Sequence, residues 1–239
     1  MDTIKFEKRG VKVIAHRGLS GLEVENTCSA FVGAGNRSYY GIETDIHRTA
    51  DGHFAINHDD NFSRVAGIDK KIEELTLEQI RQIILFDKNG EKSRNDLRPA
   101  CLEEYLSICK KYEKHAILEL KSNFTDEEIS QIIEIIKSFD YLDMVTFISF
   151  DYENLLKVRS ILPNQSAQYL FWKITDEELS RLSRDKIDID VWCNELSEEQ
   201  IKKAHSLGLV VNCWTVNEAC DGERLALWGI DYITTNILE

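Results

Sequence analysis

Two histidines in the first quarter of the chain stand beside charged residues. His16 ends an apolar run over residues 11–15 and is followed by Arg17, and His58 is followed by two aspartates. Histidine transfers protons near neutral pH, and an arginine beside it attracts anions. We therefore take His16 and His58 as candidates for acid and base catalysis on an anionic substrate.

Acidic residues also occur inside two apolar segments, where unpaired carboxylates are costly to bury. Glu43 and Asp45 alternate along one segment, and Glu119 and Lys121 alternate along another. Residues two apart on a β-strand point to the same face, so each pair faces one direction. Three converging carboxylates repel one another, and a divalent cation that prefers oxygen ligands, Mg²⁺ or Ca²⁺, would relieve the repulsion. The alternative is a structural ion network with Arg17 and Lys121.

A hard cation, two histidines and two basic side chains fit phosphoryl transfer or the cleavage of a phosphodiester. The cation and Arg17 would draw charge onto the nonbridging oxygens. One histidine would take a proton from the attacking hydroxyl, and the other would give one to the leaving alkoxide. The sequence has no G-x-S-x-G motif, and this mechanism needs no serine or cysteine nucleophile.

Eight short apolar segments are expected to form buried parallel strands that position these residues. They are residues 11–15, 41–46, 116–120, 144–148, 167–170, 187–191, 209–214 and 232–234. Helical patterns separate most of them, and capping boxes start at Thr125, Thr175 and Ser197. This alternation predicts an α/β fold, a (β/α)8 TIM barrel, with a doubly wound open sheet as the alternative.

The connection between the second and third predicted strands is too long for a plain loop. Residues from about 50 to 99 contain a short extended piece ending at His58, a predicted helix over 76–86 and the polar run 87–96. We interpret them as a small insertion over one end of the barrel, within a single domain that spans residues 1–239. The active site of a parallel barrel forms at the carboxyl ends of its strands, where the candidate residues are expected to meet.

The overall composition narrows the class of protein. A net charge of −13 argues against binding to nucleic acid or to anionic membranes, which needs a basic surface. We find no apolar run long enough to span a membrane and no signal peptide at the start of the sequence. The six cysteines contain no C-x-x-C pair, so we expect reduced cysteines and a cytoplasmic location.

Eight short motifs follow one another along nearly the whole chain. They are IAHRG at 14–18, ENT at 25–27, GIETDI at 41–46, TADG at 49–52, NHD at 57–59, LELK at 118–121, SFD at 149–151 and CWTVN at 213–217. In this order they resemble the glycerophosphodiester phosphodiesterase family. One departure is Val24, which stands where the family often has proline, and it affects the stiffness of the first loop rather than the mechanism. We expect Glu25 and Asn26 to shape this loop and to cap the helix that follows it.

The resemblance implies a (β/α)8 barrel with a small insertion after the second strand. It implies hydrolysis of a small-molecule glycerophosphodiester to glycerol 3-phosphate and an alcohol, with one divalent cation, Mg²⁺ or Ca²⁺. A glycerol hydroxyl would attack phosphorus, and water would open the resulting cyclic phosphate. The implied metal ligands are Glu43, Asp45 and Glu119, the acid–base pair is His16 and His58, and the substrate contacts are Arg17, Lys121 and Trp214, with Phe150 as a further candidate.

Three alternatives stay open. Lysophospholipase D-type cleavage of a lipid phosphodiester would require an apolar ridge near the insertion, which the polar run 87–96 does not obviously supply. A metal-dependent lyase or isomerase would use Lys121 as a base, but it leaves His16 and Arg17 without a role. A non-catalytic barrel that binds a phosphorylated ligand would not need both histidines and all three acids.

Overall fold

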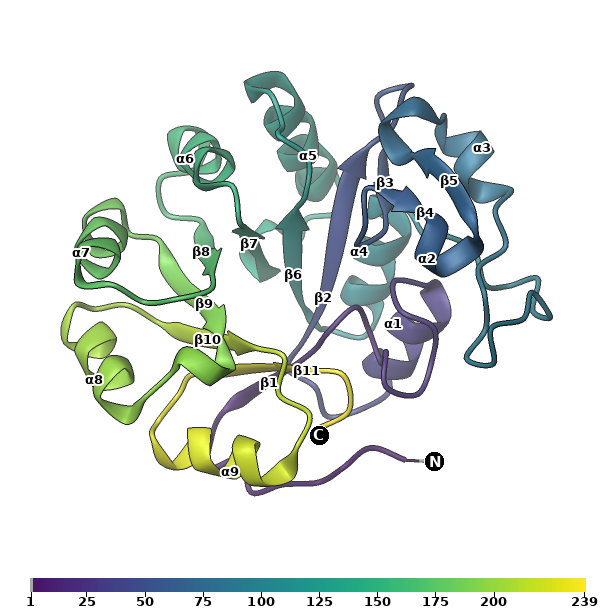
Figure 1. The fold of residues 1–239 in the computed structure, drawn as a ribbon. Helices are drawn as coiled ribbons and strands as arrows, with labels where there is room; N and C mark the ends of the chain where they lie inside the picture. Colours follow the sequence, from purple (N-terminus) through teal and green to yellow (C-terminus); the bar gives the residue numbers. More distant parts are fainter. Residues whose placement is uncertain (1) are drawn as a thin grey trace.

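The computed structural model describes residues 2–239, and in this part of the chain eight parallel strands close into a barrel surrounded by helices (Figure 1). Around the barrel the strands follow the order β1, β2, β6, β7, β8, β9, β10 and β11. β1 pairs with both β2 and β11, so the sheet closes on itself. The (β/α)8 barrel is thus confirmed, and an open doubly wound sheet is excluded.

All eight predicted strands are present, with ends that differ from the prediction by a few residues. They are β1 Lys12–Ala15, β2 Gly41–Arg48, β6 His115–Leu120, β7 Val145–Ser149, β8 Ser166–Phe171, β9 Asp188–Trp192, β10 Val211–Trp214 and β11 Tyr232–Thr235. Their middle residues are buried on both faces, because helices cover the outside and side chains fill the inside.

Within residues 2–239, seven helices of eight or more residues lie around the barrel. They are α1 Cys28–Gly35, α4 Leu102–Lys111, α5 Asp126–Ser138, α6 Tyr152–Ile161, α7 Asp176–Asp185, α8 Glu198–Ser206 and α9 Ala219–Leu227. The predicted capping boxes at Thr125, Thr175 and Ser197 are formed, and each hydroxyl accepts the backbone N–H three residues later. These caps satisfy amide groups that the first helical turn leaves free.

Helix α5 illustrates how the helices attach to the barrel. Ile129, Ile132, Ile133 and Ile136 recur at helical spacing, and all four are buried in the main core. Burying one such side chain contributes roughly 1.5–3 kcal/mol relative to leaving it exposed. The core therefore lies mainly between the outside of the barrel and its helices, and this packing holds the strand ends in place.

The connection between β2 and β6 forms its own small structure beside the barrel. It contains β3 Phe54–Ile56, β4 Asn61–Phe62, α2 Ser63–Ala66, β5 Ile68–Lys71, η1 Ile72–Glu74 and α3 Leu77–Arg81. β3 runs antiparallel to β2, and β4 pairs with β5. A separate apolar cluster around Phe62, Ile72 and Ile80 holds these elements together.

The helix predicted over residues 76–86 is shorter than expected and ends at Arg81. Ile83 and Leu85 are buried in the apolar cluster of the connection. Leu85 and Phe86 donate their backbone N–H groups to Leu97 and Val65 instead of continuing the helix. Every second side chain of this segment is buried, and its backbone bonds to segments far away in the sequence, as in an extended chain. These contacts outweigh the local helical pattern.

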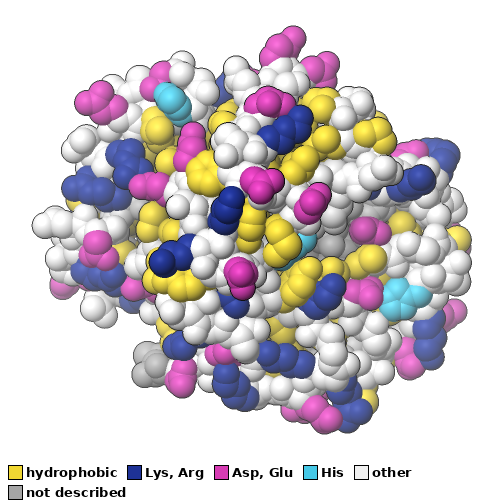
Figure 2. All heavy atoms as spheres, turned by 180° about the vertical axis from the view of Figure 1, so that it is seen from behind, with side chains coloured by type: hydrophobic (Ala, Val, Ile, Leu, Met, Phe, Trp, Pro, Cys, Tyr) yellow, Lys and Arg dark blue, Asp and Glu magenta, His cyan; other side chains and the backbone are white. Residues whose placement is uncertain are grey.

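The surface carries charges of both signs, and the cysteines are not linked to one another. In the part of the chain that the structure describes, no helix combines the length and the apolar character needed to cross a bilayer. The face shown in Figure 2 carries acidic and basic side chains next to one another, with hydrophobic side chains between them. The six cysteines are free thiols.

Candidate active site

Alternation along the strands decides which residues stand at the mouth of the barrel. Four aliphatic side chains, Ile14, Ile117, Ile148 and Leu170, pack together in the interior. The residue two positions later along the chain is at or directly after the carboxyl end of each strand, one layer nearer the mouth. These residues are His16, Glu119, Phe150 and Trp172. The first two are ionisable and the last two are aromatic, so the mouth has two chemically different halves.

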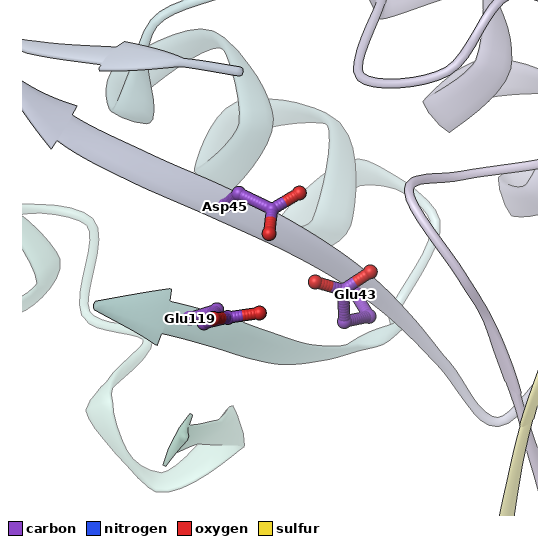
Figure 3. A group of neighbouring side chains, drawn as sticks. All are labelled: Glu43, Asp45 and Glu119. Carbon is purple, nitrogen blue, oxygen red and sulfur yellow. The ribbon is translucent and has the colours of Figure 1, made fainter. Parts of the chain in front are cut away.

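The three predicted carboxylates meet on the ionisable half. Figure 3 shows Glu43 and Asp45 on β2 facing Glu119 on β6. The parallel register places Asp45 directly beside Glu119. One oxygen from each of the three carboxylates lies within 4.8 Å of the other two, and all three residues are buried.

The three carboxyl groups cannot all ionise easily in one buried place. Burial and the charge of Asp45 raise the pKa of Glu43 well above its usual range and raise the pKa of Glu119 to about 8. Burial alone would raise the pKa of Asp45, but Arg17 and Lys121 outweigh it and lower that pKa to about 2. Positive charge beyond that of the nearby basic residues is thus needed to ionise all three.

The donor set fits a hard divalent cation. All three groups offer oxygen, the ligand atom that Mg²⁺ and Ca²⁺ prefer. Oδ1 of Asp45 is buried and has no hydrogen-bond partner among the described residues. The Nζ of Lys121 lies 3.0 Å from Glu119 and 3.8 Å from Asp45, so this lysine neutralises only part of the charge. These three residues could therefore hold a metal ion.

The two predicted catalytic histidines line one cavity and are oriented in the same way. Nδ1 of His16 lies 2.7 Å from Oδ1 of Asn236, and Nδ1 of His58 lies 2.7 Å from Oδ1 of Asp59. Both acceptor oxygens favour a proton on Nδ1, which leaves Nε2 of each ring available for proton transfer. Nε2 of His16 is 4.0 Å from Oε2 of Glu43. Burial lowers the pKa of both rings, that of His16 to about 4.

Arg17 is held between the acids rather than extended into solvent. Its backbone N–H donates to Glu43 at 2.8 Å, its Nη1 donates to Glu25 at 2.9 Å, and its Nε is 3.6 Å from Asp45. The residue adopts φ of 55°, and Gly18 follows with φ of 77°. A Cβ on Gly18 would stand 2.7 Å from the Ala30 backbone, so only glycine fits this turn.

Asn26 is a site residue that sequence reasoning misassigned. We expected Glu25 and Asn26 to shape the first loop and cap the helix, but Thr27 is the cap of α1. Asn26 is buried, and its Nδ2 donates to Oδ2 of Asp45 at 2.8 Å while its Oδ1 accepts from Thr44. It therefore fixes the orientation of a candidate metal ligand. The Glu-Asn-Thr motif was the available signal.

The other half of the mouth is aromatic. Trp214 meets Phe150 at 5.6 Å and Trp172 at 4.8 Å between ring centroids, and Trp172 also contacts Phe150 and Trp192. Trp172 is 59% exposed and Phe150 is 39% exposed. We call these four rings the aromatic rim. The sequence pointed to Trp214 and Phe150 but missed Trp172 and Trp192, whose position two residues after an inward-facing residue was the available signal.

One cavity of about 120 Å³ connects the two halves. It is lined by seven of the nine predicted residues: His16, Arg17, Glu43, His58, Glu119, Phe150 and Trp214. The two remaining residues are adjacent, since Asp45 belongs to the acidic group and Lys121 contacts Glu119. The cavity also contacts Asp190, a buried acid on β9 that sequence reasoning missed because it appeared to be an ordinary strand residue.

A closed parallel barrel that gathers acids, basic side chains and two oriented histidines at the carboxyl ends of its strands is typical of barrel hydrolases that act on anions. Comparison with known families makes this specific. Residues 16–239 match the model of the Glycerophosphoryl diester phosphodiesterase family, and the chain belongs to this family. It is therefore an enzyme of the phosphoric diester hydrolase class.

Individual relatives agree with the family match over nearly the whole chain. A glycerophosphodiester phosphodiesterase from Caldanaerobacter subterraneus subsp. tengcongensis is 28% identical over 94% of this chain and 93% of its own length. A glycerophosphodiester phosphodiesterase from Bacillus subtilis is 26% identical over 95% of this chain and 83% of its own.

Among solved structures, a phosphodiesterase from Oleispira antarctica in complex with the product sn-glycerol 3-phosphate superposes with a TM-score of 0.87. The two sequences are 25% identical, and the match covers 94% of this chain and 92% of the Oleispira chain. The barrel is thus shared with an enzyme of this chemistry along almost its entire length.

Proposed function

We propose that the protein hydrolyses glycerophosphodiesters to glycerol 3-phosphate and an alcohol. In this proposal Glu43, Asp45 and Glu119 hold one divalent cation, Mg²⁺ or Ca²⁺, and His16 and His58 are the acid–base pair. The observation that carries the proposal is the single cavity where both imidazoles, each fixed through Nδ1, stand beside the acidic group.

The two histidines are suited to move protons at defined atoms. Nε2 of one ring takes the proton of the attacking glycerol hydroxyl as its oxygen bonds to phosphorus. Nε2 of the other ring gives a proton to the oxygen of the leaving alcohol as its bond to phosphorus breaks. Burial lowers the pKa of His16 to about 4, so this ring is available as the base near neutral pH. The ring that acts as the acid must first take up a proton on Nε2, and at His58 the charge of Asp45 and the hydrogen bond to Asp59 favour that proton by opposing the effect of burial on the pKa. The cation, when bound, supplies positive charge that stabilises the phosphate oxygens.

The remaining predicted residues position the substrate. Arg17 and Lys121 bring positive charge to the edge of the acidic group, where a phosphate would lie. Trp214 supplies an apolar wall for the organic part of the substrate. We also propose that residues 1–239 act as one domain whose insertion at about 50–99 brings His58 to the mouth, and that the enzyme works in the reducing cytoplasm.

Release of glycerol 3-phosphate from glycerophosphodiesters with different alcohols tests the proposal, with Mg²⁺, with Ca²⁺ and with a chelator. We expect His16→Ala and His58→Ala each to lower kcat by about 10²–10⁴-fold while the protein still binds the metal ion. Full activity in both variants would rule out the two-histidine mechanism. The variant His205→Ala, on the outside of the barrel, serves as the matched control.

The aromatic rim favours a second candidate, cleavage of lysophospholipids. If the substrate were a lipid, an apolar ridge was expected near the insertion. The exposed Phe150 and Trp172 lie elsewhere at the mouth, directly after the ends of β7 and β8. An acyl chain would gain by covering these exposed rings. A higher kcat/KM for a lysophospholipid than for its deacylated diester would favour this candidate, and the reverse order would favour the first.

A further inference from the structure

Asp190 is a buried acid in the catalytic cavity that the proposed reaction does not use. It lies in the middle of β9 with 2% of its surface exposed, and it lines the same cavity as His16 and Glu43. Its Oδ1 has no hydrogen-bond partner among the described residues. A buried polar atom left in this way costs roughly 1–3 kcal/mol, so the position works against stability.

The neighbouring polar residues do not relieve this cost at Oδ1. Asn212 donates to Gln168 at 3.3 Å, and Thr234 donates to Asn212 at 3.3 Å. Asn212 also interacts with the carboxyl group of Asp190 and opposes the rise in its pKa that burial causes, but Oδ1 still has no partner. Oδ1 of Asp190 is therefore buried without a partner in a residue that lines the cavity.

A second unpartnered polar atom lines the same cavity. Nε1 of Trp214 is buried and has no acceptor among residues 2–239. Trp214 is on β10, which pairs directly with β9, and Asp190 and Asn212 are partners in that pairing. A hydrogen-bond acceptor, Oδ1 of Asp190, and a donor, Nε1 of Trp214, therefore both lack a partner in residues that line one cavity.

A hydroxyl group matches this pair better than other ligand groups. It accepts a hydrogen bond from the indole N–H, and it pairs with a carboxyl group in either protonation state because it both donates and accepts. The cavity of about 120 Å³ exceeds the space that one water needs, about 10–15 Å³, so an organic fragment fits. The acidic group beside it is where the phosphate of the same molecule would be held.

We propose that Asp190 and the indole N–H of Trp214 bind a hydroxyl of the polyol half of the substrate. Asp190 is then a specificity residue that selects polyol phosphates over phosphates of simple alcohols. This inference rests on the proposed function and adds Asp190 as the residue that recognises a hydroxyl of the polyol. The barrel gives up stability at Asp190 in the free enzyme, and the bound hydroxyl compensates for it.

The test compares two ligands of equal chain length, sn-glycerol 3-phosphate and n-propyl phosphate, by calorimetry in saturating Mg²⁺ or Ca²⁺. The full-length protein should bind glycerol 3-phosphate at least about 10-fold more tightly, because only that ligand carries the hydroxyls. In Asp190→Leu the affinity for glycerol 3-phosphate should fall by about 10–100-fold, and the affinity for n-propyl phosphate should not change. Asp190→Asn keeps a donor and an acceptor and should stay within about 3-fold of the wild type.

Thermal unfolding separates this role from a structural one. Asp190→Leu should unfold at the same or a higher temperature, because it removes a buried polar group whose Oδ1 has no partner. A lower Tm with equal loss of both ligands would overturn the inference, as would unchanged affinities. If the wild-type enzyme releases glycerol 3-phosphate and binds it, such results refute only the role of Asp190. If it does neither, the proposed function itself fails.

Discussion

The two halves of the barrel mouth use the same backbone positions for opposite chemistry. At the carboxyl ends of β1 and β6, the residue two positions after an interior aliphatic side chain is His16 or Glu119. At the carboxyl ends of β7 and β8 it is Phe150 or Trp172. The ionisable half brings three buried carboxyl groups together, and their negative charges repel one another. It is therefore stable only when positive charges lie beside them. The aromatic rim gains from covering apolar surface.

This difference indicates a division of labour for a substrate with an anionic centre and an organic arm. The phosphate belongs with the acids, the basic residues and the histidines, and the organic groups belong with the rings. Asp190 and Trp214 lie where the two halves meet, which is where a hydroxylated carbon next to a phosphate would be placed. Disturbing one half at a time should therefore change different kinetic parameters.

The largest effect is expected from Asp45, the centre of the ionisable half. Asp45→Ala removes one oxygen donor and leaves Arg17 and Lys121 near one another without their shared counter-ion. We expect kcat/KM to fall by more than about 10³-fold and metal affinity to fall with it. Activity assays and metal titration by calorimetry measure both. The exposed Asp143→Ala variant should behave as wild type, and equal losses in the two variants would contradict the assignment.

Asn26 should have a smaller effect on the same half. Asn26→Gly removes the hydrogen bond to Asp45 yet tolerates the φ of 57° at this residue. Loss of a group that orients a metal ligand typically costs about 10–100-fold in metal affinity or activity. Lys186→Gly makes the same backbone change at φ of 54° at the end of α7 and is the control. A loss of stability alone, with intact metal affinity, would make Asn26 a purely structural residue.

The acids should also make the stability of the metal-free protein depend on pH. The folded pKa of Glu119, about 8, lies above that of an unfolded glutamate, about 4.3. Between these values the folded state binds more protons, so the free energy of unfolding falls as pH rises. In EDTA, Tm should decrease between about pH 7.5 and 8.5, above the range in which ordinary histidines, with a pKa near 6.5, titrate. The expected decrease is about 2–4 °C per kcal/mol lost.

Two controls isolate this effect. The variant Glu119→Gln should show a flatter dependence over the same range, because it cannot lose a proton. Saturating Mg²⁺ or Ca²⁺ should also flatten it, since the cation stabilises the ionised carboxylates. A Tm that rises with pH in EDTA would show that the acids ionise freely, and it would remove the argument for a cation.

The smallest effect is expected on the aromatic rim. Trp172→Ala removes the most exposed ring, which contacts Trp214 and Phe150 but does not line the cavity. KM for substrates with a bulky alcohol should rise by about 2–10-fold, with kcat nearly unchanged. Leu227→Ala, which removes a side chain that is 62% exposed on α9, is the matched control. A fall in kcat without a change in KM would place Trp172 in the chemistry instead.

Much of the fold and part of the site follow from local sequence patterns. Apolar runs gave all eight barrel strands, and Thr125, Thr175 and Ser197 marked helix starts, because strand alternation and capping depend on residues close together in the chain. The helix at 76–86 was overestimated, since contacts to Val65 and Leu97 override the local pattern. Such contacts have no signature within a short window.

By itself, the sequence determined which residues share a strand face: Glu43 with Asp45, and Glu119 with Lys121. Only the tertiary structure decided that Asn26 holds Asp45, that four rings form the aromatic rim, and that Asp190 lines the cavity with one oxygen buried and unpartnered. The physical reason is that alternation is a property of each strand alone. Distances between strands, and the partners left unmatched inside, arise only when the barrel closes.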